Sequence, residues 1–354
     1  MCLLENTPTY LKCIYKLIGI VQFSYSLIPK FPKIYHRLWS LPLFCYFIYL
    51  CVEYNLHKRP NTEIFFYIDH CTNYGNILSI PFCFLCNYQR SNSLRMLLLK
   101  LIEVKPCSIT HPNRKYLKYN NWYRLILIGL LLLNFIFFPF YHNPSQFILY
   151  MYYFGPIMHC FDILFLNDVL NIVLYKFEMI NQHLRRRINF NVQHVQELSL
   201  LHHRLVHLAI EIVKNFETTI IAALIMWFES VLETVYYTIF LMVNGQSRPI
   251  IEYGGNLVFL AYCFSWFFIM IGVFSRVQNK ANQTATLVHD IWNECATRRG
   301  LDERMRHLQL ISLRLLNTKL RFTAKELFFL DWTFCHTMIA AVATYVVILI
   351  QFQI

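Results

Sequence analysis

The sequence contains two pairs of ionisable side chains at a spacing that could support chemistry. Glu229 and Glu233 are four residues apart, and so are His203 and His207. Because residues four apart share one face of a helix, the glutamates could act as an acid–base pair and the histidines could bind a metal. No nucleophile or histidine accompanies the glutamates in the sequence, and no His-Glu-x-x-His motif contains the histidines. We therefore predict a binding or structural role for the glutamates and no enzyme activity.

The Cys-x-x-Cys pair of Cys83 and Cys86 is a third candidate site. A zinc or redox centre of this type needs a second pair, and none follows downstream. The nine glycines are scattered, and none forms the glycine-rich turn of a nucleotide-binding fold. The sequence therefore predicts no metal and no cofactor.

The composition is typical of a polytopic membrane protein. Of the 354 residues, 56 % are hydrophobic, 17 % are aromatic and only 15 % are charged, with a mean hydropathy of +0.39. Soluble chains carry about a quarter charged residues. The net charge of +12 fits cytoplasmic loops better than nucleic acid binding, because no nucleic-acid motif accompanies the basic runs. We expect these runs, Arg185–Arg187 and Arg298–Arg299, to contact anionic membrane lipid or the acids of a neighbouring subunit.

Seven segments are long and apolar enough to cross a bilayer. A hydrocarbon core of about 30 Å requires roughly 20 mostly apolar residues per helix. The predicted spans are 38–55, 64–86, 124–142, 147–170, 219–243, 255–275 and 330–352. The second and fourth spans are interrupted by Asp69, His70, Asp162 and Asp168.

The positions of Lys and Arg orient these helices. If the N-terminus lies in the cytoplasm, all but three of the 32 basic residues lie on the inner side, and the exceptions are Lys58, Arg59 and Arg248. The positive-inside rule therefore predicts a cytoplasmic N-terminus and an extracellular C-terminus. The short outer loops contain no cysteine, so we expect no extracellular loop disulfide.

The predicted fold class is an all-α membrane protein whose seven transmembrane helices extend into a cytoplasmic anchor bundle. Apolar residues recur at helical spacing in the long inner segments, for example at Ile311, Leu315, Leu316 and Leu320. We expect one domain, residues 1–354. Its parts are a cytoplasmic N-terminal segment, 1–37; helices one to six with their inner extensions, 38–275; an anchor segment, 276–329; and the last helix, 330–354.

The last helix carries one faintly polar face. Thr344, Val347, Ile348 and Gln351 stand at i, i+3, i+4 and i+7, so they share that face. A narrow pore in an oligomer requires such a stripe, in which an apolar constriction lies beside a polar ring. Hydrogen bonds from Thr344 and Gln351 to neighbouring helices would produce the same pattern.

The residues from Thr344 to Phe352 also form a positioned motif of Thr-Tyr, five apolar residues and Gln-Phe. This motif resembles the C-terminal signature of insect gustatory receptors. Upstream, Phe322–Ala324 and Phe328–Asp331 are similar to the stretch that enters the last helix in that family. The predicted seven-helix layout with an inside N-terminus agrees with the family over the whole chain.

Two departures from the family pattern bear on the ligand. Lys325-Glu326 replaces a Cys-Gly-like pair often found there, and Val346 stands where sugar-sensing members usually carry Glu. The second departure disfavours a sugar receptor, although other sugar sensors lack that Glu. By exclusion we expect a bitter or other non-sugar compound.

The resemblance implies a ligand-gated, non-selective cation channel in the plasma membrane of sensory neurons. Four copies of the last helix would line the pore, in a homotetramer or in a heteromer with related receptors. The implied partners are a small-molecule tastant, permeant cations and membrane lipid, with no nucleic acid. The expected pore-lining residues are Thr344, Val347, Ile348, Ile350, Gln351 and Phe352.

Polar and aromatic groups inside the predicted spans are the candidates for the ligand pocket. Polar groups at bilayer depth are costly, so they tend to face the interior of the helix bundle. An aromatic pocket with a few polar groups is the usual form of a small-molecule site. The candidates are Tyr67, His70, Asn73, Tyr74, Tyr153, His159, Glu229, Glu233, Tyr236, Tyr262 and Trp266. Core packing and an interfacial aromatic belt would also explain many of these positions.

The alternative function is a metabotropic chemoreceptor of the G-protein-coupled type. It requires an outside N-terminus, which the basic residues oppose. The sequence has no Asp-Arg-Tyr after helix three and no Asn-Pro-x-x-Tyr in helix seven. A transporter often shows two related halves, and we find no internal repeat.

Overall fold

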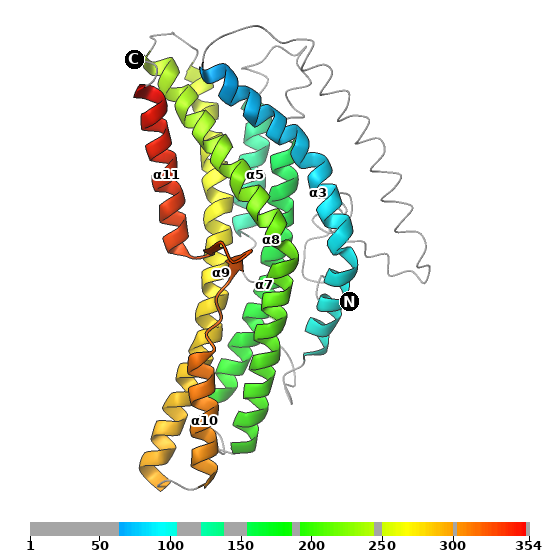
Figure 1. The fold of residues 1–354 in the computed structure, drawn as a ribbon, viewed down its shortest axis with the longest axis vertical. Helices are drawn as coiled ribbons and strands as arrows, with labels where there is room; N and C mark the ends of the chain where they lie inside the picture. Colours follow the sequence, from blue (N-terminus) through cyan, green and yellow to red (C-terminus); the bar gives the residue numbers. More distant parts are fainter. Residues whose placement is uncertain are drawn as a thin grey trace, which may run out of the picture.

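The computed structural model describes residues 64–104, 122–137, 154–185, 192–243, 250–299 and 303–351. This part of the chain is almost entirely helical (Figure 1). Its elements are α3 (Ile64–Glu103), α5 (Trp122–Phe137), α7 (Phe154–Arg185), α8 (Val192–Val243), α9 (Ile250–Arg299), α10 (Glu303–Asn317), β1 (Thr323–Ala324), β2 (Phe328–Phe329) and α11 (Trp332–Gln351). Six of the seven predicted spans overlap these helices, although residues 138–142 of the third span and 147–153 of the fourth lie outside the described residues. The first span, 38–55, and the N-terminal segment, 1–37, lie outside the described residues.

Two helices are far longer than a bilayer is thick. α8 has 52 residues and α9 has 50, so at 1.5 Å per residue each is about 75–78 Å long. Because a hydrocarbon core is about 30 Å thick, more than half of each helix extends beyond it. The prediction that helices four, five and six continue past their spans is confirmed, since α7, α8 and α9 are each unbroken. Four of the described helices, α7, α8, α9 and α11, meet a length and apolarity criterion for crossing a membrane.

Helix α7 is the centre of the bundle. It packs against α3, α8 and α9, and every residue from Ile157 to Leu170 is buried. A helix surrounded on all sides has no exposed face, which explains why its sequence is apolar all round instead of amphipathic. The polar residues that interrupt this stretch, Asp162 and Asp168 among them, therefore have to find partners inside the protein.

The end of the molecule farther from the C-terminus is formed by α10 and the adjacent halves of α8 and α9 (Figure 1). α10 packs on α9 and α8 through Met305, Leu308, Ser312 and Leu315, which are buried at helical spacing. The helical periodicity predicted there is present over this helix. It ends at Asn317, however, so Leu320 belongs to the following link, where it is buried.

A β-hairpin joins α10 to α11 at the end of the predicted anchor segment, 276–329. β1 and β2 pair antiparallel, with Thr323 opposite Phe329. The turn between them places Lys325 at φ 46° and Glu326 at φ 60°, a region that favours glycine. Two consecutive residues in this conformation cannot continue a right-handed helix. The Lys325-Glu326 departure noted in the sequence is therefore accommodated by a turn.

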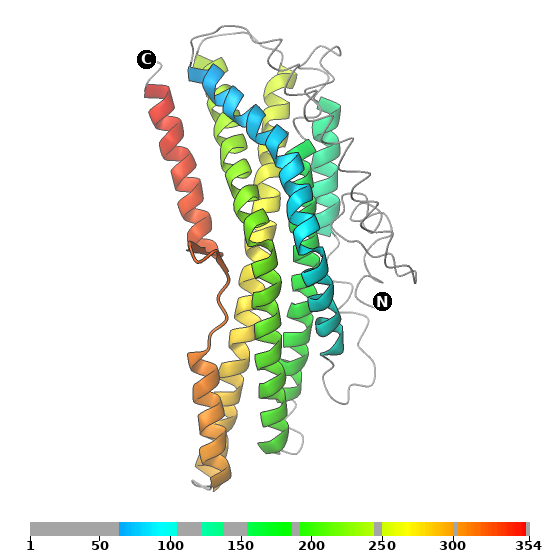
Figure 2. The ribbon, with the colours of Figure 1, turned by 45° about the vertical axis from the view of Figure 1, so that its right-hand side comes forward.

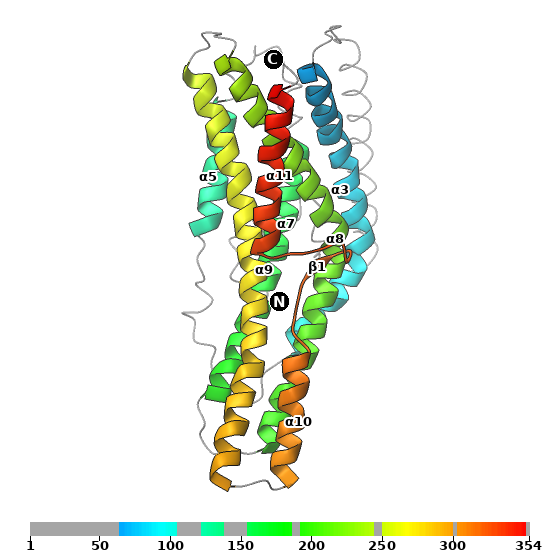
Figure 3. The ribbon, with the colours of Figure 1, turned by 60° about the vertical axis from the view of Figure 1, so that its left-hand side comes forward.

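Two side chains of α9 hold this link in place. The amide of Asn282 accepts a hydrogen bond from the backbone N–H of Leu320 (2.9 Å) and donates one to the Leu320 carbonyl (3.2 Å). Gln278 donates to the carbonyl of Leu330 over 3.2 Å. The base of α11 is thus anchored on α9 at both ends of the hairpin. Figure 3 shows the hairpin at mid-height, with α11 rising from it in front of α8 and α9.

His202 makes the packing of α8 on α9 sensitive to acid. It lies on α8 before the predicted span 219–243, and its Nε2 lies 3.0 Å from the Ala281 carbonyl, while Nδ1 has no partner among the described residues. Burial lowers the pKa of His202 from its ordinary value of 6.5 to about 4. The unfolded chain therefore takes up this proton at higher pH than the folded protein does.

We expect acidification from pH 6.5 to about 4 to lower the free energy of unfolding by up to about 1.4 kcal/mol per pH unit through this group. Above pH 6.5 it should have no effect. His202→Gln keeps a donor for the Ala281 carbonyl and removes the titration, so it should flatten this part of the pH profile. The measurement is thermal unfolding of the purified protein across this pH range. His203→Gln, at the exposed neighbouring position, should keep the wild-type slope, and an equal flattening in both variants would contradict the assignment.

Candidate ligand site and pore helix

A fully buried ion pair joins α3 to α7. Arg90 donates through Nη2 to Oδ1 of Asp162 over 2.7 Å, and neither side chain has appreciable exposure. Removing two charges from water costs several kcal/mol per ion, and their attraction offsets this only when further hydrogen bonds complete the pair. The surroundings of Arg90 supply those bonds.

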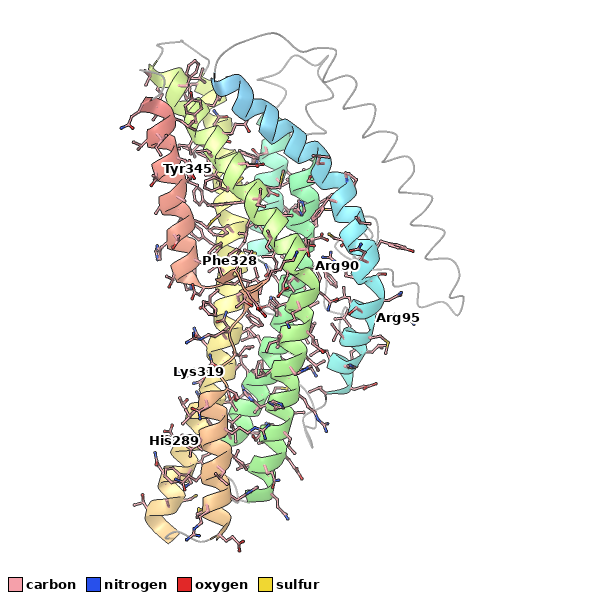
Figure 4. The ribbon with its side chains drawn as sticks, in the orientation of Figure 1. Arg90, Arg95, His289, Lys319, Phe328 and Tyr345 are labelled. Atoms are coloured by element: carbon pink, nitrogen blue, oxygen red, sulfur yellow. The ribbon has the colours of Figure 1, made fainter. Side chains whose placement is uncertain are left out.

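Helix α8 and Asn87 complete the environment of Arg90. Nη1 donates to the hydroxyl of Thr219 over 3.0 Å, and Asn87 Oδ1 accepts a further bond. The guanidinium also lies 4.0 Å from the centre of the Phe216 ring, a cation–π contact. Three helices therefore meet at Arg90. Figure 4 shows Arg90 at about the same height along the bundle as Phe328 of the hairpin.

A second buried pair joins α5 to α7. Arg124 donates to Asp168, and both side chains are buried. Both acidic residues that interrupted the fourth predicted span are thus paired with an arginine at, or just beyond, the end of another predicted span. Sequence reasoning missed both pairs because it assigned these arginines only to the inner loops.

Aromatic side chains fill part of the interface between α8 and α9. The indole of Trp227 stacks on Phe267 with 4.3 Å between ring centres, and its Nε1 donates to the Cys263 carbonyl over 3.0 Å. Tyr262 interacts with Cys160 of α7, and both side chains are buried. These contacts join α7, α8 and α9 in one cluster.

Four of the predicted ligand residues are buried in this bundle. His159 of α7, Tyr236 of α8, and Tyr262 and Trp266 of α9 all have less than a tenth of their surface exposed. Their burial fits core packing and a ligand site equally, so their contact with a ligand stays a prediction. Trp227 and Phe267, which complete the cluster, were not predicted.

The remaining predicted ligand residues lie on α8 and α3. Glu229 and Glu233 are half-buried, and Glu229 approaches α3 so closely that its Oε2 would be 3.1 Å from a Cβ at Gly75. Glycine at this position allows the two helices to meet. Tyr67, His70, Asn73 and Tyr74 belong to α3, but their side chains lie outside the described residues, as does Tyr153.

The predicted histidine and cysteine pairs behave differently. His207 lies exposed on α8 and pairs with Glu211 over 3.5 Å, and His203 is exposed as well, as expected for a solvated helix face. Cys83 is buried and Cys86 is half-buried. The Sγ of Cys83 lies 3.2 Å from Nδ1 of His159, a contact between α3 and α7 that sequence spacing could not indicate.

Helix α11 has two distinct faces. Cys335, Val342 and Val346 are buried against the bundle. Thr344, Val347, Ile348 and Gln351 are exposed on the opposite face, so the predicted stripe exists as one surface of the helix. Ile350 is half-buried against the core, and Phe352 lies outside the described residues.

The exposed face of α11 continues toward the hairpin with further polar residues. Thr333, His336 and Thr337 are exposed there, and sequence reasoning did not include them. The hydroxyl of Thr344 donates to the Ala340 carbonyl over 2.9 Å, and that of Thr337 to the Thr333 carbonyl over 3.0 Å. Both threonines thus bond to their own helix, which leaves the face free of any bond from them to another helix.

Aromatic contacts connect α11 to the rest of the molecule. Tyr345 meets Phe228 of α8 edge to face at 5.7 Å, and Trp332 lies 6.3 Å from Phe268 of α9. Otherwise α11 stands at one side of the bundle, opposite α5 (Figure 2). Of the residues in its most apolar stretch only 17 % are buried, compared with 78 % for α7.

Comparison with known proteins identifies the family. Residues 13–354 match the sequence pattern of the 7tm chemosensory receptor family. The chain belongs to this family. The resemblance to insect chemoreceptors inferred from its C-terminal motif is thereby confirmed, and the receptor is a multi-pass protein of the plasma membrane.

One similar protein is the putative gustatory receptor 28a of Drosophila melanogaster, with 26 % identity over 163 residues. The aligned stretch spans 45 % of the receptor and about a third (35 %) of that relative. The fold is similar to that of the insect olfactory receptor OR5 from Machilis hrabei. The TM-score is 0.63 at 15 % identity, over 97 % of the receptor and 98 % of OR5. OR5 in complex with eugenol superposes with a TM-score of 0.65 at the same identity and coverage.

We expect Asp162→Asn to destabilise the receptor by about 3–5 kcal/mol, because it leaves the Arg90 charge buried without its partner. The matched control is Glu211→Gln, which breaks the exposed pair with His207 and should cost about 1 kcal/mol or less. The readout is thermal unfolding of both purified variants. Equal shifts would show that the buried pair does not hold α3 on α7.

Proposed function

We propose that this receptor is a ligand-gated, non-selective cation channel that opens when a small-molecule tastant binds. The observation that carries the proposal is the exposed face of α11, where Thr344, Val347, Ile348 and Gln351 lie opposite the buried face. An apolar constriction beside polar side chains is a suitable lining for a gated pore. Membership of the chemosensory receptor family supports this assignment.

One α11 helix cannot enclose a pore, so the channel requires several copies. We propose a homotetramer, or a heteromer with related receptors, in which the exposed faces of four α11 helices surround the conduction path. Val347 and Ile348 would form the apolar constriction, with Ile350 packed behind them against the bundle, and Gln351 with Phe352 would follow at its outer end. Thr333 and Thr337 would extend the lining inward with hydroxyl groups.

The distribution of basic residues supports a cytoplasmic N-terminus and an extracellular C-terminus. In this orientation the Gln351 end of α11 faces the outside, and α10 with the adjacent halves of α8 and α9 forms the cytoplasmic anchor. The aromatic cluster around Trp227 and Tyr262 then lies near the middle of the predicted spans 219–243 and 255–275, at bilayer depth.

The aromatic cluster is the proposed ligand site. Its rings offer apolar surface, and His159, Glu229 and Tyr236 offer a few polar groups, as small-molecule sites require. The structure of OR5, which has a similar fold, has been determined in complex with eugenol. This supports a small organic compound as the ligand of the receptor. Val346 faces the bundle, where sugar-sensing relatives usually carry Glu, so we favour a bitter or other non-sugar tastant.

The path from the ligand to the pore is short. Phe228 contacts Tyr345 of α11 and is the direct neighbour of Trp227 and Glu229 on α8. A ligand that displaces α8 at this point would move the outer half of α11 with it. Membership of the chemosensory receptor family supports the proposed class of function, and the contact of Phe228 with Tyr345 would provide a physical route for gating.

The test of the function is whole-cell current from cells that express only this chain, with G-protein signalling blocked, during a screen of sugars and bitter compounds. We expect a ligand-evoked cation current that survives the block. A current abolished by the block would refute the channel and favour the metabotropic alternative. The same cells serve for the pore variants.

We expect Val347→Ala and Gln351→Ala to change single-channel conductance or basal opening without reducing surface expression, because both side chains lie on the exposed face of α11. Leu132→Ala is the matched control. Leu132 is a comparably exposed apolar residue on α5, at the opposite side of the bundle. Conductance and opening should be unchanged in this control. If the α11 variants also leave the currents unchanged, the pore lining is wrong.

A further inference from the structure

Three buried side chains with metal-binding atoms meet between α3 and α7. One ligand atom each from Cys83, His159 and Asp162 lies within 4.8 Å of the others. All three residues are almost completely buried. Cys83 is one turn before Asn87 on α3, and His159 is three residues before Asp162 on α7, so two rigid helices position the group.

The separations suit a tetrahedral metal ion. Bonds of about 2.0–2.3 Å to sulfur, nitrogen and oxygen place the ligand atoms of a zinc site roughly 3.3–3.6 Å apart. The Sγ of Cys83 already lies 3.2 Å from Nδ1 and 3.4 Å from Nε2 of His159. Either ring nitrogen can therefore act as the metal ligand. The carboxylate oxygen of Asp162, which lies within 4.8 Å of the other two ligand atoms, would have to move slightly closer to them.

Asp162 supplies the independent observation that points to a ligand. The carboxylate interacts with Arg90 through Oδ1 and with the side chain of Asn87, and its buried Oδ2 makes no hydrogen bond of ordinary geometry to a described residue. A buried carboxylate oxygen without a partner is costly, because a carboxylate normally accepts several bonds. A metal ion bound to Oδ2 would satisfy this oxygen and leave the ion pair with Arg90 intact.

We propose that Cys83, His159 and Asp162 bind a divalent transition-metal ion of the zinc type. The donor set of one thiolate, one imidazole and one carboxylate suits Zn²⁺, and three protein ligands leave a fourth position for water. The thiol proton leaves on binding, so affinity falls as the pH is lowered. The ion would tie α3 to α7 beside the junction with α8, and so would oppose relative movement of these helices.

The test uses the purified full-length receptor and Co²⁺ as a spectroscopic probe in place of Zn²⁺. We expect a thiolate-to-cobalt charge-transfer band with the visible bands of a tetrahedral site, and loss of both on addition of Zn²⁺. Cys83→Ser should abolish the charge-transfer band. Cys86→Ser, one turn further along α3 and outside the cluster, should retain it.

His159→Gln gives a second test at the same site, with Co²⁺ affinity reduced by about tenfold or more. We avoid Asp162 because its replacement also leaves Arg90 unpaired. Three results would overturn the proposal: no thiolate band in the wild-type receptor, a band that persists in Cys83→Ser, or a band that is lost equally in Cys86→Ser. The second would assign the signal to another of the twelve cysteines. The readout involves neither tastant nor current, so it is independent of the proposed channel function.

Discussion

The charge of Asp162 constrains the arrangement of the inner part of the bundle. The residue is completely buried in α7, and a carboxylate in such surroundings persists only with an oppositely charged, well hydrogen-bonded partner. Arg90 of α3 provides the opposite charge. Its guanidinium also donates a hydrogen bond to Thr219 and lies over the ring of Phe216, both on α8. The three helices are therefore fixed in register, because sliding α3 or α7 would separate the two charges, and sliding α8 would remove Thr219 and Phe216 from the guanidinium. Arg124 and Asp168 impose the same condition on α5.

Helix α11, in contrast, is held on the bundle by few contacts and by no buried ion pair among the described residues. Most of its apolar surface is exposed. Its base is fixed through the hairpin, which Asn282 and Gln278 hold on α9, and its outer half touches α8 through Tyr345. An element with few buried contacts has low local stability and moves first. A firm base and a loosely packed length are the properties that a gate requires.

The fold of the receptor tolerates far more sequence change than ligand recognition does. The receptor shares its fold with an olfactory receptor at 15 % identity over nearly the whole of both chains. Such similarity is physically reasonable, because helices in lipid need only an apolar surface of sufficient length and satisfied backbone groups. Recognition of a ligand depends on individual side chains such as Trp227 and Tyr262. These are free to differ between relatives without loss of the fold.

The helical membrane class, most of the spans, the continuation of α7, α8 and α9 beyond them, and the family could all be predicted from the residues alone, because hydropathy, helical period and a C-terminal motif are local properties. The residues also indicated that Thr344, Val347, Ile348 and Gln351 share a face, since 3.6 residues per turn suffices for that. Three features became visible only in the folded protein: the contact of Arg90 with Asp162, the contact of Cys83 with His159, and the hairpin before α11. The first two are contacts between helices far apart in the chain, which depend on tilt and rotation that no single helix encodes. The hairpin depends on anchoring by α9, which a helical continuation could not satisfy.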